Sequence, residues 1–109
     1  MNNISLYIGE YLLGNLLAGN SKYYFTANAE GIDRARQKHP IEMLLFQLND
    51  NGMAEYDKLP ELFAKYINAA DRKDLMQLSG INSTDSDYEK LYKLAGLTLE
   101  PAPFIIKQA

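Results

Sequence analysis

The sequence predicts a small α+β domain, in which an N-terminal antiparallel sheet with a short helix is followed by about three helices and a C-terminal edge strand. Three observations predict this class. The N-terminal part alternates apolar and polar residues between turn signals, the later part carries apolar residues at helical spacing, and an apolar triplet follows two prolines near the C-terminus. A chain of 109 residues with 47% apolar and 23% charged residues fits one globular domain spanning residues 1–109.

The first strands are indicated by alternation and by turn residues. Ile4–Ile8 alternates, Gly9 and Glu10 suit a turn, and residues 11–18 resume an apolar run. After a second turn at residues 19–22, residues 23–26 are aromatic and β-branched. We therefore expect a three-stranded antiparallel meander.

A short helix is predicted next. Asn28 is a suitable N-cap, Arg36 and Lys38 suit the C-terminal end of the helix dipole, and Pro40 ends the helix. In residues 41–48 the apolar residues are too continuous for their period to separate strand from helix, and we interpret this run as a strand.

The rest of the chain reads as a loop, three helices and an edge strand. Residues 49–52, Asn-Asp-Asn-Gly, are the clearest turn signal in the sequence. The helices are predicted from their caps and from apolar residues on one face, and two of them end at a glycine. They begin near Asp57, Asp71 and Ser86, the last two end at Gly80 and Gly96, and Phe104, Ile105 and Ile106 form the edge strand.

Composition narrows the function classes. A net charge of -3 does not favour phosphate backbones, so we expect no direct contact with nucleic acid. The absence of cysteine excludes a disulfide framework, a thiolate nucleophile and the usual structural zinc site. The N-terminus has no basic segment ahead of an apolar run, and residues 11–18 are too short to span a membrane, so we expect a cytoplasmic protein.

Candidate catalytic groups are few. His39 is the single histidine, and Pro40 should prevent a helix from placing it on the same face as Glu42. A serine hydrolase would have to use His39 as its base. The sequence therefore predicts no catalytic residue, no metal site and no cofactor, and a small hydrolase ranks third among the functional hypotheses.

Aromatic residues point instead to packing and protein contacts. The chain has eight Tyr and four Phe, and aromatic residues at helical spacing belong in the core more often than at an interface. Met53 and Tyr56 flank a polar loop and are better interface candidates. The aromatic residues predicted to fill the core are Phe63, Tyr66, Tyr88 and Tyr92.

The order of elements resembles the N-terminal subdomain of HipA-family serine/threonine kinases. The similar motifs are Leu-Tyr-Ile at residues 6–8 followed by Leu-Leu-Gly-Asn-Leu at residues 12–16, and the aromatic strand at residues 24–26. A Pro-led apolar segment at residues 40–45 and Leu-Pro-Glu-Leu-Phe at residues 59–63 continue the resemblance. It extends over most of the chain and ends where the kinase core would begin, which is typical of the stand-alone HipS proteins of tripartite HipBST toxin–antitoxin systems.

The resemblance implies an antitoxin or regulatory protein that binds and restrains a HipA-like kinase toxin, HipT. A larger complex with a DNA-binding HipB-like protein is also implied. Since loops on a rigid scaffold commonly carry binding residues, we expect contacts from the loop at residues 49–56 and its neighbour. The predicted contact residues are Phe46, Asn49, Asp50, Asn51, Met53 and Tyr56. The second hypothesis is an adaptor or self-associating module unrelated to kinases.

Overall fold

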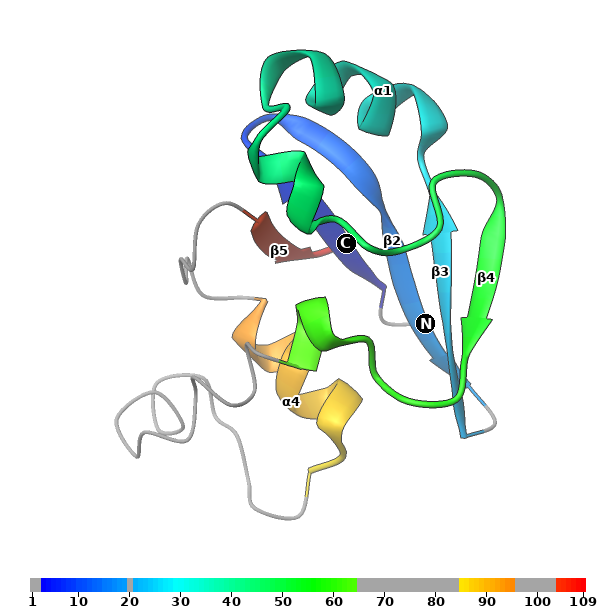
Figure 1. The fold of residues 1–109 in the computed structure, drawn as a ribbon. Coiled ribbons are helices and arrows are strands. Elements are labelled where there is room, and N and C mark those ends of the chain that lie inside the picture. The colour runs from blue at the N-terminus through cyan, green and yellow to red at the C-terminus, as the bar shows by residue number, and fades with distance from the viewer. Residues whose placement is uncertain (1–2, 20, 65–84, 96–103) are drawn as a thin grey trace.

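An antiparallel sheet organises the molecule. The computed structural model describes residues 3–19, 21–64, 85–95 and 104–109. Within these segments β1 (Ile4–Ile8), β2 (Tyr11–Gly19), β3 (Lys22–Ala27), β4 (Met53–Tyr56) and β5 (Phe104–Gln108) form a five-stranded sheet in the order β4-β3-β2-β1-β5 (Figure 1). The predicted α+β class is confirmed.

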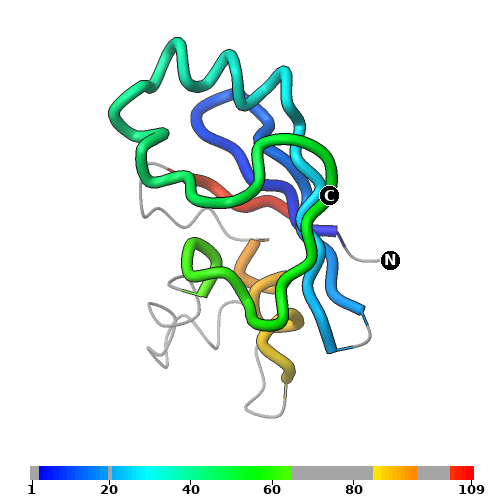
Figure 2. Tube along the Cα trace, turned by 45° about the vertical axis from the view of Figure 1, so that its right-hand side comes forward, coloured from blue at the N-terminus to red at the C-terminus, as the bar shows by residue number. Residues whose placement is uncertain are grey.

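The two ends of the chain meet in this sheet. The expected meander of β1, β2 and β3 is present, and β5 pairs with β1 in antiparallel register, with Leu6 opposite Ile106. Figure 2 shows the last strand lying beside the first. The C-terminal edge strand is therefore confirmed, and β1 becomes a central strand with its apolar residues buried.

The helix α1 (Ala29–Lys38) begins and ends where the sequence predicts. The Asn28 side chain accepts a hydrogen bond from the Gly31 amide at 3.4 Å, and the His39 amide donates to the Ala35 carbonyl at 2.6 Å. Gly31 lies against the Leu12 carbonyl of β2, in a space that leaves no room for a Cβ atom. This close approach lets Ile32 and Ala35 reach the core.

The strand expected over residues 41–48 is wrong. The chain forms a turn of 3₁₀ helix, η1 (Glu42–Leu45), and then runs to the loop at residues 49–52. Side chains three residues apart share a face of a 3₁₀ helix. Met43 and Phe46 are accordingly buried, while Ile41 and Leu44 are exposed. A segment with apolar residues on both sides lacks the period that separates strand from helix, which explains the error. The 3₁₀ turn also takes the place of the apolar strand that the HipA resemblance implied at residues 40–45.

The later helices are confirmed where the structure describes them. Residues 61–64 are helical, with the Phe63 and Ala64 amides both donating to the Pro60 carbonyl at 2.9 Å. In α4 (Asp87–Leu94) the Ser86 hydroxyl accepts a hydrogen bond from the Glu89 amide at 3.2 Å, as its capping pattern predicts. The helix expected from Asp71, the side chain of Tyr66 and the glycine at position 96 lie outside the described residues.

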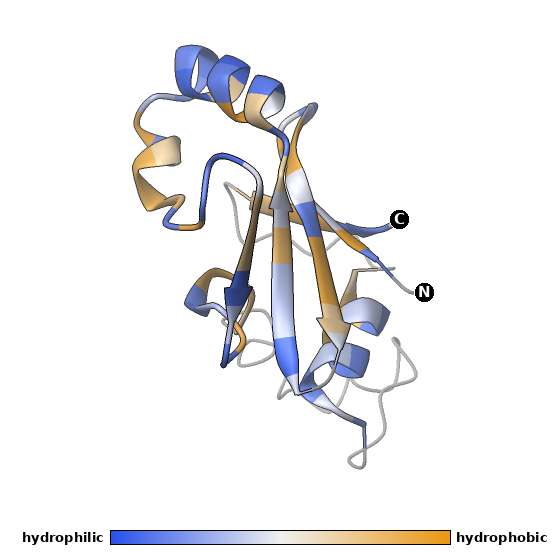
Figure 3. Cartoon of the chain, turned by 90° about the vertical axis from the view of Figure 1, so that its right-hand side faces the viewer, coloured by the Kyte–Doolittle hydropathy of each residue, from blue (hydrophilic) through white to orange (hydrophobic). Residues whose placement is uncertain are grey.

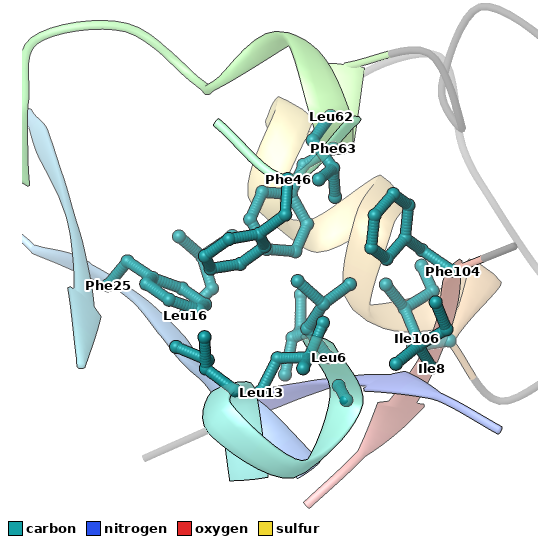
Figure 4. Close-up of a cluster of buried hydrophobic side chains, with 14 of the residues drawn as sticks. Leu6, Ile8, Leu13, Leu16, Phe25, Phe46, Leu62, Phe63, Phe104 and Ile106 are labelled. Atoms are coloured by element: carbon teal, nitrogen blue, oxygen red, sulfur yellow. The ribbon is translucent and has the colours of Figure 1, made fainter. Parts of the chain in front are cut away.

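The core lies between the sheet and the helical segments on one of its faces. Figure 4 shows Phe25 of β3 facing Phe46, with Phe63 behind them. The ring centroid of Phe25 lies 6.1 Å from that of Phe46 and 6.2 Å from that of Phe63. Phe63 is fully buried, which confirms its predicted place in the core, while Tyr88 and Tyr92 are partly buried and pack against the same cluster.

The other face of the sheet has no described helix over it (Figure 3). One row on this face runs across Ser5, Asn15, Thr26 and Met53. The Ser5 hydroxyl donates to the Asn15 side-chain oxygen at 2.7 Å, which satisfies the buried serine. No helix in the described segments is long and apolar enough to cross a membrane.

Replacing Gly31 by Ala should destabilise the fold, although the same change in an exposed helix stabilises it by about 1 kcal/mol. The added methyl group would overlap the Leu12 carbonyl, so α1 must move away from β2. We expect a loss of about 1–3 kcal/mol in the free energy of unfolding, measured by urea denaturation. Gly19→Ala is the control, since its Cβ would meet Tyr24 at an ordinary 3.9 Å. Equal stability of the two variants would contradict this packing.

Tyr88 links α4 to the sheet through a hydrogen bond. Its ionisation should lower the free energy of unfolding at alkaline pH. Its hydroxyl donates to the Leu16 carbonyl of β2 at 2.9 Å. Burial, with a smaller contribution from Tyr92, raises the pKa of Tyr88 to about 12 from its usual 10. The favourable contribution is therefore complete below pH 10 and is lost as the pH rises toward 12.

Tyr88→Phe should cost about 1 kcal/mol at neutral pH through the lost hydrogen bond. It should also reduce the fall in unfolding free energy above pH 10, where the unfolded tyrosine begins to ionise. Tyr92→Phe is the matched control in the same helix. An identical alkaline profile for wild type and Tyr88→Phe would show that Tyr88 is not the responsible group.

Candidate functional site: an apolar docking surface

The predicted contact residues do not share one face. Phe46 is buried in contact with Phe25, so its side chain belongs to the core and not to the surface. Residues 53–56, expected to be loop, form the edge strand β4 paired with β3. Because strand side chains alternate between faces, Tyr56 lies on the core side of the sheet while Met53 lies on the opposite face. The partner-binding role of these residues stays a prediction.

The polar loop at residues 49–52 is held by its own hydrogen bonds. The side-chain nitrogen Nδ2 of Asn49 donates hydrogen bonds to the backbone carbonyls of Asn51 at 3.3 Å and Gly52 at 2.8 Å. The Asn49 backbone amide donates to the Tyr56 hydroxyl at 3.2 Å, and that hydroxyl donates to the Asn49 side-chain oxygen at 3.3 Å. Asn49 thus shapes the loop, and its polar groups are engaged within the chain.

The same loop is fastened to the elements beside it. The Ala27 amide at the end of β3 donates to the Gly52 carbonyl at 2.8 Å, and Gly52 takes a positive φ of 67° that favours glycine. Asp50 pairs with Arg36 of α1 at 3.1 Å. Asn51 is exposed at the tip. The loop is therefore a preformed connection between α1, η1 and the sheet.

Three of the four large apolar side chains that are exposed in the described residues gather just before this loop, on η1 and its N-cap residue, and the fourth is Met53 on β4. Ile41 is 77% exposed, Leu44 76% and Leu45 56%. We call these three residues the η1 patch. Figure 3 shows η1 in largely hydrophobic colours beside the hydrophilic α1. Because Met43 and Phe46 anchor the opposite side of the turn in the core, the patch is held outward by the fold itself.

A groove continues the η1 patch. It has a volume of about 330 Å³ and is bounded by Leu45 at one side and by the segment at residues 60–62 at the other. Its apolar lining also includes Leu48 and Tyr56, which pack against the core. Among the described lining residues, Glu61 is the charged one, and Gln47 adds a neutral polar side chain. The groove and patch form one surface of protein-contact character, since they are apolar with a polar rim.

Sequence reasoning missed the η1 patch because it treated residues 41–48 as one buried strand. A signal was present. Ile41 and Leu44 are separated by three residues, as are Met43 and Phe46, and period three would have divided the run into two faces. The pattern does not state which face is buried, and only the contact of Phe46 with Phe25 decides that.

His39 illustrates a second difference from expectation. Its Nδ1 atom lies 3.9 Å from the Glu42 carboxylate, so the turn after Pro40 brings together two residues that a broken helix was expected to separate. The His39 ring also lies edge-on to Tyr11, with centroids 6.1 Å apart. These contacts hold η1 near the β1–β2 hairpin. Among the described residues no cluster of three His, Cys, Asp or Glu side chains could hold a metal ion.

Tyr56→Phe should loosen the loop at residues 49–52 without unfolding the sheet. The variant removes the hydroxyl that the Asn49 amide donates to. Since a hydrogen bond of this kind contributes about 1 kcal/mol, hydrogen exchange at Asn49 should accelerate about fivefold in NMR measurements. Tyr24→Phe is the control, since Tyr24 lies on the sheet face opposite the core. Unchanged exchange at Asn49 would show that the hydroxyl does not hold the loop.

Comparison with known proteins adds no assignment. No family model matches the chain. No curated protein matches its sequence. The resemblance to the HipA family therefore stays a prediction that rests on the motifs quoted from the sequence, and the apolar strand that it implied at residues 40–45 is a 3₁₀ turn instead.

Proposed function

We propose that this chain is an antitoxin or regulatory protein that binds and restrains a HipA-like serine/threonine kinase toxin of the HipT type. The observation that carries the binding role is the η1 patch, in which three large apolar side chains are presented on an anchored turn. The kind of partner rests on the resemblance of the sequence to the N-terminal subdomain of these kinases. A HipB-like DNA-binding protein is the further partner expected in the complex.

The energetic argument favours a protein partner at the η1 patch. Burying one exposed Leu or Ile side chain stabilises a complex by about 1.5–3 kcal/mol, and about 1.4 kcal/mol changes the dissociation constant tenfold. Ile41 and Leu44 are both more than three-quarters exposed in the free chain. Covering both is therefore worth more than a hundredfold in affinity before the costs of association. Contact through this patch requires no catalytic group in the chain.

Co-expression with the kinase expected to be encoded beside this chain tests the proposal. Wild type should co-elute with the kinase in size-exclusion chromatography and lower its phosphorylation activity. The Ile41→Ser/Leu44→Ser double variant should weaken the complex at least tenfold. Its unfolding free energy should change by less than about 0.5 kcal/mol, because the two side chains are exposed.

Asp33→Ser is the matched control, an exposed change on α1 away from the patch. Separate elution of the two wild-type proteins, with undiminished kinase activity, would refute the antitoxin proposal. Sedimentation of the isolated chain addresses the self-associating alternative. A stable dimer that the double variant disrupts, together with indifference to the kinase, would favour that second function.

A further inference from the structure

We propose that the groove beside the η1 patch receives a partner segment in which a large apolar side chain is followed by Lys or Arg. The inference rests on the proposed protein-binding role of this surface and specifies the chemistry of what it binds. The described lining of the groove comes from the segment at residues 45–48, from Tyr56 and from the segment at residues 60–62, and it includes Gln47. Glu61 stands in this lining as its charged member.

The size of the groove selects a side chain rather than a cofactor. Its volume of about 330 Å³ lies at the lower limit for small-molecule pockets, which range from about 300 to 1,000 Å³. Four of the seven described lining residues are aliphatic, and the polar groups come from Gln47, Tyr56 and Glu61. One or two apolar side chains of a protein segment match this space and this lining.

The electrostatic character of the groove selects the neighbour of that side chain. Glu61 is exposed and makes no ion pair with another described residue. Among the described residues, Glu42 on η1 has one ion-pair partner, His39, whose Nδ1 atom lies 3.9 Å from the carboxylate. Within the part of the chain that the structure describes, no lysine or arginine lines the groove. A Lys or Arg of the partner would thus meet a carboxylate that has no competing cation among the described lining residues.

The inside of the groove is already organised to receive an anchor. Leu48 and Tyr56 pack against the core, and the Tyr56 hydroxyl is engaged by Asn49. Leu62 is buried to 9% exposure, whereas Leu45 at the rim is 56% exposed. The depth is therefore fixed by core contacts, and Leu45 is the exposed apolar side chain of the lining that a bound segment would cover.

Titration with three peptides tests the proposal without any kinase. The probes are N-acetylated heptapeptides Gly-Ser-Leu-Leu-Arg-Lys-Gly, Gly-Ser-Leu-Leu-Glu-Glu-Gly and Gly-Ser-Ser-Ser-Arg-Lys-Gly, observed by amide chemical shifts of the labelled protein. The first should shift the amides of Leu45, Leu48, Tyr56 and Leu62 and bind about two- to fivefold more tightly than the second, with the difference reduced by salt. The third should give no saturable shifts at these residues.

Glu61→Lys should reverse the preference between the first two peptides. Glu89→Lys is the matched control, because it makes the same charge change in the first turn of α4, outside the groove lining. Equal affinity for both Leu-containing peptides would overturn the proposal. Chemical-shift changes confined to the sheet face opposite the core would overturn it as well. So would concentration-dependent shifts at the groove without peptide, which would identify a second copy as the occupant. Kinase binding without peptide selectivity would refute this inference alone.

Discussion

The contact of Phe25 with Phe46 and Phe63 is the interaction on which the arrangement of the surface depends. Phe25 belongs to β3. Phe46 directly follows η1, and Phe63 comes after β4 in the chain. One buried ring thus holds η1 and the helical turn at residues 61–64 against the same sheet. The groove is the space left between them, and the η1 patch is the side of the turn that Phe46 cannot bury.

A period of three explains why this surface is apolar. A strand or an amphipathic helix through residues 41–48 would divide the run by period two or 3.6, and its apolar face would lie on the core. In η1 the pair Met43 and Phe46 faces inward, so Ile41 and Leu44 must face outward. Exposure of these two side chains to water is unfavourable in the free chain. A partner that covered them would therefore gain affinity.

The polar loop has a different role from the one that its composition suggests. Asn49, Asp50 and Gly52 are engaged with Tyr56, Arg36 and Ala27 respectively. Such a loop sets the position of η1 relative to β4, so the polar residues support the neighbouring apolar surface. In the proposed docking role this arrangement would lower the ordering cost of association, because the supporting backbone is fixed before a partner binds.

The sequence by itself determined the local elements: the meander, the Asn28 and Ser86 caps, and the β-forming triplet at the C-terminus. These follow from turn chemistry, capping and alternation, which act over a few residues. The tertiary structure alone decided that residues 42–45 form η1, that β4 joins β3, and that Met53 and Tyr56 point to opposite faces. It also decided which apolar residues remain outside. The reason is that a short apolar run fits several local conformations, and the choice among them depends on long-range packing against Phe25, a residue distant in sequence.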